Sequence, residues 1–165
     1  MEDDRRRLLF AAATLFGATL VPLATAAAAA LRKSDREWKA LLPANRYRVL
    51  FQEDTEPPFS SPLNGEKRAG IFICAACFQP LFDATRKFDS GTGWPSFWEV
   101  LPGAVGTKSD LALGMSRIEY HCARCGGHQG HVFDDGPAPT HLRYCNNGLA
   151  LQFVAAGQPL PALRT

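Results

Sequence analysis

Two C-x-x-C pairs constrain the fold of this 165-residue chain more than any other feature. Cys74-Ala-Ala-Cys77 and Cys122-Ala-Arg-Cys125 stand far apart in the sequence. Paired knuckles of this kind predict four thiolate ligands around one structural Zn²⁺, which would close the intervening segment into a loop. Instead of binding zinc, the four cysteines could form a pair of disulfide bonds, or one C-x-x-C pair could be a redox dithiol of the thioredoxin type. A redox pair is expected near a β-α-β pattern, whereas short strands surround these pairs, so we favour zinc.

The fifth cysteine, Cys145, lies outside the pairs and shares a short segment with three of the four histidines. His128 and His131 open a predicted strand that runs into an Asp-Asp-Gly-Pro turn. A second strand over residues 141–145 would return beside the first and bring the imidazoles next to the Cys145 sulfur. Because a neighbouring base holds a thiol as the reactive thiolate, we expect catalysis here. The alternative is a chance neighbourhood of surface histidines and a buried cysteine.

Glycine and proline are frequent, with 14 and 12 residues, which implies many turns and favours a mainly β (α+β) architecture. Two short helices are expected near the N-terminus. The first follows a capping box of Ser34 and Glu37, and the second spans about residues 45–51. Within 116–121, the alternation at Ile118 and Tyr120 indicates a half-buried strand. The predicted strands cover residues 71–74, 81–82, 97–100, 116–122, 132–133, 142–145 and 149–154.

The first 30 residues predict a targeting segment followed by one domain over residues 31–165. Three arginines, at 5–7, precede an apolar run, and residues 24–26 form a small-x-small site for a signal peptidase. The start resembles a twin-arginine export signal, so we expect a periplasmic protein. The alternative is an uncleaved membrane anchor through residues 8–31, which exceeds the ~20 residues of a spanning helix. Pro22 and the weak hydrophobicity of alanine favour cleavage.

Charge and one aromatic turn add two further indications. The net charge is only +2, and the lysines and arginines are scattered along the chain except at the extreme N-terminus. Charge therefore gives no support to nucleic-acid binding. In residues 89–97, Asp-Ser-Gly-Thr-Gly-Trp-Pro-Ser-Phe, two glycines deliver Trp94 just before a proline. Such a turn can present the indole as a wall for an apolar or sulfur-bearing substrate. The alternative is a tryptophan packed in the core beside Phe97 and Trp98.

Six motifs, in this order and spacing, resemble the methionine sulfoxide reductases of type B: TEPPF, CAAC, FDSGTGWPSF, CARC, GHVFDDGP and RYCNN. The likeness extends over about residues 45–154. It implies two antiparallel β-sheets, short N-terminal helices packed outside them, and a zinc ion that joins two loops away from the active site. The activity that it implies is reduction of the R epimer of methionine sulfoxide in proteins and peptides.

The resemblance also implies roles for individual residues. Cys145 matches the nucleophile, and Trp94 matches the wall that receives the S-methyl group of the substrate. His128, His131 and Asn147 match the polar groups around the sulfoxide. An imidazolium can protonate the sulfoxide oxygen while a thiolate attacks, which would leave a sulfenic acid on the cysteine and release methionine.

Two positions and the leader depart from the pattern of part of the family, and the leader before Ser34 is absent from cytosolic members. Thr92 stands where many members carry a resolving cysteine, so the reductant is expected to be an external thiol, either a thioredoxin-like protein or a small molecule. Gly148 replaces a serine often found after the asparagine. The expected partners are oxidised proteins or peptides and this reductant, without nucleic acid. We expect the protein to be a monomer. Alternatives of other classes are a zinc-stabilised binding module without catalysis, and a disulfide oxidoreductase that uses one C-x-x-C pair.

Overall fold

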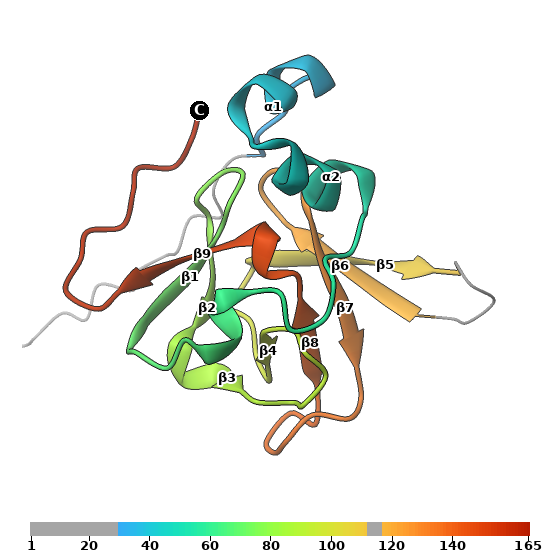
Figure 1. Cartoon of the computed structure of the whole chain (residues 1–165), viewed down its shortest axis with the longest axis vertical. Helices are drawn as coiled ribbons and strands as arrows, with labels where there is room; N and C mark the ends of the chain where they lie inside the picture. Colours follow the sequence, from blue (N-terminus) through green and yellow to red (C-terminus); the bar gives the residue numbers. More distant parts are fainter. Residues whose placement is uncertain (1–29, 112–116) are drawn as a thin grey trace, which may run out of the picture.

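The computed structural model describes residues 30–111 and 117–165, which form two antiparallel β-sheets with two short helices at one end (Figure 1). The predicted leader, apart from residue 30, lies outside the described residues, so its separation from a domain over 31–165 stays a prediction. Within the described ranges, the helices are all too short or too polar to cross a membrane.

The helices begin where local signals place them. α1 (Asp35–Leu41) follows Ser34, whose side chain accepts a hydrogen bond from the Glu37 backbone N–H at 3.4 Å. The Glu37 carboxylate accepts in return from the Ser34 N–H at 2.7 Å, so the predicted capping box is complete. α2 (Ala44–Gln52) comes next, after Pro43, and matches the second predicted helix within one residue at each end.

The smaller sheet has the strand order β2-β1-β9, and all its pairs are antiparallel. The larger sheet has the order β3-β4-β8-β7-β6-β5 and is also antiparallel. Both sheets confirm the architecture implied by the family resemblance. The strands are β1 (Gly70–Cys74), β2 (Pro80–Asp83), β3 (Lys87–Phe88), β4 (Ser96–Phe97), β5 (Val105–Asp110), β6 (Arg117–Cys122), β7 (His128–Phe133), β8 (Arg143–Asn146) and β9 (Leu151–Ala155). Single turns of 3-10 helix are η1 (Pro62–Gly65), η2 (Ala84–Arg86) and η4 (Gly148–Ala150).

Several details differ from the sequence prediction, among them β3, which was not predicted, and residues 149–150, which lie in η4 and not in a strand. β5 was not predicted, because its sequence Val-Gly-Thr-Lys-Ser-Asp has almost no apolar residues, as suits an edge strand. The strand expected over 97–100 ends at Phe97, since the next backbone N–H turns to the Arg86 carbonyl. On β6, Tyr120 is buried as expected, but Ile118 is half exposed and Glu119 is buried between histidines.

Aromatic side chains join the two sheets. Phe82 of β2 stacks on Phe97 of β4 with ring centroids 4.0 Å apart, and Phe72 of β1 meets Phe97 edge-on at 4.9 Å. Tyr120 of β6 meets Phe82 edge-on at 6.3 Å. These contacts fix the larger sheet, including β4, against the smaller one.

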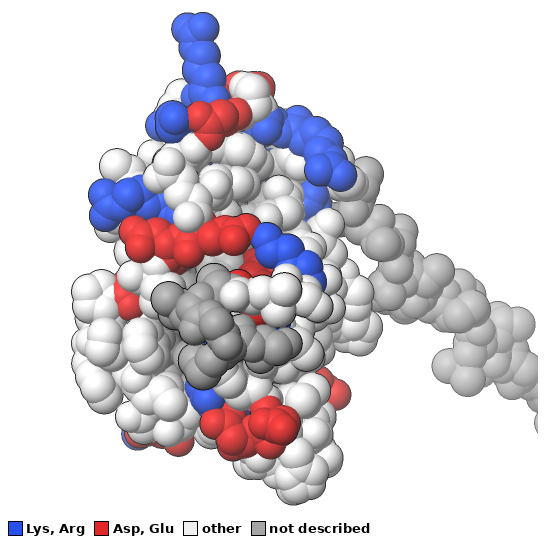
Figure 2. Space-filling model, turned by 90° about the vertical axis from the view of Figure 1, so that its right-hand side faces the viewer, with Lys and Arg blue, Asp and Glu red and all other residues white. Residues whose placement is uncertain are grey.

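Charged side chains of both signs lie close together on the surface. Figure 2 shows lysines and arginines beside acidic residues on the side of the molecule that is at the right in Figure 1. Ion pairs between neighbours include Arg117 with Asp110 at 2.7 Å and Arg86 with Glu99 at 3.0 Å. Because opposite charges this close cancel at a distance, this side carries no extended field of one sign.

Candidate active site and metal centre

The pairing of β7 with β8 places His131 directly opposite Cys145. Directly opposite residues project from the same face of a sheet with Cβ atoms about 4.5–5.5 Å apart, so the imidazole and the thiol are neighbours. The strand return predicted from the sequence is therefore confirmed. β8 begins at Arg143 rather than near His141, because His141 has a φ of 58° and its N–H and carbonyl close the preceding turn.

A hollow of about 140 Å³ opens at this pair. It brings together four of the five site residues predicted from the sequence: Cys145, His131, Trp94 and Asn147. The described residues that line it do not include His128. The complete lining consists of Thr55, Trp94, Arg117, Gly130, His131, Phe133, Cys145, Asn146 and Asn147.

His131 is held by a carboxylate that sequence reasoning missed. Its Nε2 lies 2.7 Å from Asp110 Oδ2, and the same oxygen accepts from Arg117 Nη2 at 2.7 Å. Burial lowers the pKa of His131 below its ordinary value, although the hydrogen bond to Asp110 acts in the opposite direction. Asp110 lies on β5, the strand that carried no sequence signal, so nothing in the pattern linked it to the histidine.

His128 lies behind His131 instead of in the hollow. It is 2% exposed, and its ring centroid is 5.5 Å from that of His131. Its Nδ1 is 2.7 Å from one oxygen of Glu119, whose other oxygen is 3.1 Å from His121 Nδ1. Burial alone would raise the pKa of Glu119, but the hydrogen bonds to the two imidazoles outweigh it and lower this pKa. His128 thus touches the catalytic histidine candidate, and a buried ionised carboxylate holds it in place.

Cys145 is half-buried, and burial raises the pKa of its thiol. The positive charge of Arg143 and hydrogen bonds with Thr92 and Arg143 oppose this shift. Arg143 is itself fixed: its guanidinium binds both oxygens of Asp135 at 2.7 and 2.8 Å and lies 4.3 Å from the Phe133 ring centroid. Sequence reasoning missed this arginine. The available signal was its position two residues before Cys145, which puts both side chains on one face of a strand.

Asn147 borders the hollow, yet its side chain is already engaged. Its Oδ1 accepts from the Glu56 backbone N–H at 3.0 Å, and its Nδ2 donates to the Gln129 carbonyl at 3.2 Å. The Asn147 backbone N–H donates to the same carbonyl at 2.8 Å. Asn147 therefore fastens the segment after β8 to β7 and to the Thr-Glu-Pro-Pro-Phe segment.

Glu56 is a third residue that the sequence analysis did not single out. Its carboxylate accepts from the N–H groups of Gly148 and Leu149 at 2.5 and 2.9 Å, and its carbonyl accepts from Trp94 Nε1 at 3.0 Å. One residue thus fixes both the Trp94 wall and the end of the catalytic segment. A Cβ on Gly148 would lie 1.9 Å from Ser61 Oγ, so the serine that the family resemblance implies at this position would require Ser61 to move.

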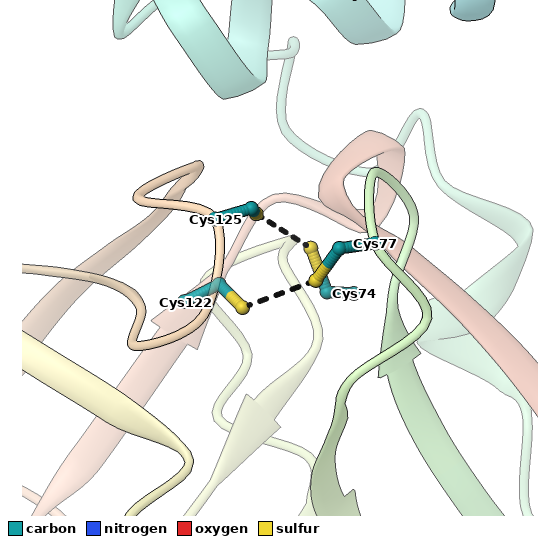
Figure 3. Close-up of side chains that lie close together, drawn as sticks. All are labelled: Cys74, Cys77, Cys122 and Cys125. Atoms are coloured by element: carbon teal, nitrogen blue, oxygen red, sulfur yellow. Dashed lines mark hydrogen bonds between the residues drawn. The ribbon is translucent and has the colours of Figure 1, made fainter. Parts of the chain in front are cut away.

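The four paired cysteines form a separate cluster between the two sheets. Their sulfur atoms all lie within 4.8 Å of one another, and they converge from the β1–β2 and β6–β7 loops (Figure 3). All five cysteines of the chain fall within the described residues and are free thiols. The sulfurs of Cys74 and Cys125 are 3.7 Å apart, and those of Cys77 and Cys122 are 3.5 Å apart.

These distances fit a tetrahedral metal and not a disulfide. Zn–S bonds of ~2.3 Å at tetrahedral angles separate two sulfurs by roughly 3.8 Å, whereas a disulfide requires about 2.05 Å. Phe78 and Gly126 follow the two pairs with φ of 67° and 74°, and each donates its N–H to the carbonyl of the first cysteine of its pair at 2.9 Å. Gln129 Nε2 lies 3.6 Å from Cys74 Sγ, where it can donate to a thiolate.

The fold and the two sites define a class of protein: a two-sheet β protein with a thiol nucleophile candidate beside an imidazole and a separate four-thiolate centre. Residues 42–155 match the SelR domain, and the chain belongs to this family. The chain is 52% identical over 125 residues to the peptide methionine sulfoxide reductase MsrB of Methanosarcina barkeri. This alignment covers 75% of this chain and 88% of the relative. The chain is 54% identical to MsrB of Caulobacter vibrioides, with 74% and 78% covered. Identity to MsrB of Pseudomonas savastanoi pv. phaseolicola is 50%, with 75% and 95% covered.

Proposed function

We propose that this chain is a peptide-methionine (R)-S-oxide reductase, which reduces the R epimer of methionine sulfoxide in proteins and peptides to methionine. Family membership supports the reaction class, and the pairing of Cys145 with His131 in a hollow walled by Trp94 is the observation that carries the proposal. The test is consumption of both sulfoxide epimers of an N-acetylmethionine amide by the purified protein with dithiothreitol. Loss of the R epimer alone is the expected result, and loss of neither would refute the proposal.

In the proposed reaction, oxygen moves from the substrate sulfur to the Cys145 sulfur. The substrate sulfur is reduced by two electrons and the cysteine sulfur is oxidised by two, so the products are methionine and a sulfenic acid. Starting from the thiolate, the step takes up one proton. His131 supplies this proton, and since Asp110 engages Nε2, the proton is exchanged at Nδ1.

The pKa shifts of the pair oppose transfer of the thiol proton to His131 in the free protein, and Arg143 is proposed to offset part of this effect. Burial raises the pKa of Cys145 and lowers that of His131, so both groups favour their neutral forms in the free protein. Transfer of the thiol proton to the imidazole creates the nucleophile and the acid together and leaves the total charge of the hollow unchanged. Trp94, held through Nε1, faces the substrate methyl group in this arrangement.

Arg143 is proposed to favour the thiolate form of Cys145. Replacing Arg143 by methionine removes a positive charge and a hydrogen bond that oppose the effect of burial, so the pKa of Cys145 should rise. The fraction of thiolate at any pH below the pKa then falls, and alkylation of Cys145 by iodoacetamide at pH 7 should slow several-fold. The measurement is the pH profile of alkylation at Cys145, followed by mass spectrometry of the peptide that contains it.

Arg86 offers a matched control, because it also combines an acidic partner with an aromatic ring, Trp98, at 4.3 Å. The Arg86→Met variant should keep the alkylation profile of the unmutated protein. An Arg143→Met profile identical to that of the unmutated protein would show that the arginine does not influence the thiol.

We further propose that an external thiol regenerates Cys145. The four other cysteines form a separate cluster, and Thr92, at the position of the resolving cysteine of many relatives, acts to lower the pKa of the Cys145 thiol. A thiol from a thioredoxin-like protein or a small molecule therefore attacks the sulfenic acid directly. Under limiting reductant, the unmutated protein should accumulate Cys145 as a sulfenic acid or a mixed disulfide.

The Thr92→Cys variant should instead form an internal disulfide with Cys145, because the Thr92 side chain is near enough to Cys145 to act on the pKa of its thiol. Peptide mass spectrometry after one turnover, without reduction, distinguishes the two products. The control is Thr85→Cys, which adds a thiol at the exposed η2 turn and should give no such bridge. An internal disulfide between Cys145 and a clustered cysteine in the unmutated protein would contradict the proposed division of the five thiols.

We also propose that Cys74, Cys77, Cys122 and Cys125 bind one structural Zn²⁺. The near-tetrahedral sulfur spacing and the all-thiolate donor set support this choice. The ion would cross-link the two loops and take no part in the reaction, since the cluster and the catalytic hollow share no residues.

We propose that residues 1–30 direct export of the protein to the periplasm. We also propose that the protein works as a monomer. The arginines at 5–7 and the small-x-small site at 24–26 support export. If transport follows the twin-arginine route, the domain would cross the membrane folded, with its metal bound and its cysteines protected. Cell fractionation that finds the full-length chain only in the cytoplasm would refute this.

A further inference from the structure

A second hollow, of about 300 Å³, adjoins the catalytic one and shares Trp94 as a wall. Phe59 also lines it, together with Asn64, Lys67, Lys87 and Asp89. We propose that this hollow binds an apolar side chain of the substrate polypeptide, one or two residues from the methionine sulfoxide. The inference rests on the proposed function and adds a subsite that selects the sequence around the oxidised residue.

Phe59 has two features that its own packing does not explain. Its side chain is 72% exposed, so it contributes little to the core. Its φ is 62°, in the left-handed region that bulky residues rarely adopt. An exposed aromatic side chain on an unfavourable backbone persists only where the surroundings fix it, and such residues concentrate at binding sites.

The surroundings of Phe59 fix it relative to Trp94. The Phe59 N–H donates to the Gly93 carbonyl at 2.7 Å, and Asn64 Nδ2 donates to the same oxygen at 2.8 Å. A Cβ on Gly93 would lie 2.8 Å from Phe59 N, so the two segments are packed as closely as glycine allows. The indole is held from its own side by the Glu56 carbonyl. Two aromatic walls are thus pre-arranged, which lowers the entropic cost of binding between them.

The rim of the hollow is polar and also ordered. Lys87 Nζ donates to the Asn64 carbonyl at 2.8 Å, which ties β3 to the η1 turn. Apolar walls with a few fixed polar groups are typical of binding hollows for small groups. Because Lys87 and Asn64 already donate to backbone carbonyls, the aromatic side chains of Phe59 and Trp94 are the groups that we propose to contact an apolar side chain.

Continuity with the catalytic hollow identifies the occupant as the substrate chain. A methionine sulfoxide within a peptide continues in both directions from the catalytic hollow. Extended chains advance about 3.3 Å per residue, and alternate side chains share a face, so a side chain two residues away lies roughly 7 Å along the same face. The far side of one shared indole is within this reach.

The experiment compares three substrates for the full chain: N-acetylmethionine-(R)-sulfoxide amide, and two pentapeptides with central (R)-sulfoxide and leucine or serine at the other positions. We expect Phe59→Ala to raise KM for the leucine peptide about fivefold with kcat unchanged, as for loss of one aromatic contact. The KM values for the serine peptide and the amide should change less than about twofold.

Three further variants control for structure. Phe59→Tyr keeps the aromatic wall and should keep the low KM for the leucine peptide. Phe59→Gly suits the left-handed backbone, so it should reproduce the rise in KM even if the alanine variant folds poorly. Leu160→Ala removes another exposed apolar side chain, at 46% exposure, and should leave all three substrates unaffected.

Each contrary result has a distinct meaning. Equal losses on all three substrates would overturn the subsite and leave the proposed function standing. A loss seen only when a thioredoxin-like protein replaces dithiothreitol would assign the hollow to the reductant and likewise overturn the inference. Failure of the unmutated protein to reduce even the amide would refute the proposed function itself.

Discussion

Cys145→Ser is expected to abolish reduction of (R)-methionine sulfoxide and to leave the fold unchanged. Serine is close in size to cysteine, and position 145 is only half-buried, so the β8 pairings should persist. An alcohol oxygen is not ionised near neutral pH, however, and it cannot take up the sulfoxide oxygen, as a thiolate does when it becomes a sulfenic acid. Because no other free thiol borders the described hollow, the loss should be on the order of 10⁴-fold or more.

The measurement is methionine released from the R sulfoxide, separated by chromatography, over long incubation. Metal content and melting temperature of the variant serve as controls and should equal those of the unmutated protein, since Cys145 is not part of the four-cysteine cluster. Appreciable residual activity in a correctly folded Cys145→Ser protein would refute the nucleophile assignment and, with it, the sulfenic acid step.

Replacing any one of the four clustered cysteines by serine should act through stability. A structural zinc ion contributes roughly 10 kcal/mol or more to folding in zinc-finger peptides, as much as the entire stability of many domains. Loss of a ligand also leaves three buried thiols close together, and burial alone raises the pKa of a thiol such as Cys74. We therefore expect metal and soluble protein to be lost together.

Atomic absorption should find about one zinc per unmutated chain and much less in each variant that can be purified. The same chemical change at Cys145 provides the matched control and should alter neither zinc content nor melting temperature. A strong chelator should lower the melting temperature of the unmutated protein. An unchanged melting temperature in a Cys74→Ser or Cys122→Ser protein would argue against a structural metal.

Local patterns predicted much of this structure, because their causes are local. The Ser34 cap, the two cysteine knuckles and the return of β8 beside β7 all depend on residues close in sequence. The division of five cysteines into four plus one followed from spacing alone, and the structure clusters the same four. Family resemblance supplied the two-sheet arrangement, which spacing and composition had left open.

Residues that act across the sheet were not predictable in this way. Asp110 reaches His131 from β5, an edge strand without an apolar pattern. Glu56 accepts from Gly148, 92 residues away in sequence. In the sequence, His128 and His131 looked equivalent because they lie three residues apart. In the structure the His128 imidazole is buried, and the strand pairing is irregular nearby, with a bulge between Tyr120 and His121 and a φ of 157° at Gly130.

Gln129 lies on β7 between the four-cysteine cluster and the catalytic segment. Its side chain reaches the Cys74 sulfur, and its carbonyl accepts both hydrogen bonds from Asn147. A local opening that frees this residue therefore disturbs both sites at once, so they belong to one cooperative unit of the native protein. For a protein that repairs oxidised methionine, oxidation of the cluster would release the catalytic segment as well. Oxidation of the four-cysteine cluster would then stop the reduction of methionine sulfoxide even if Cys145 itself is not oxidised.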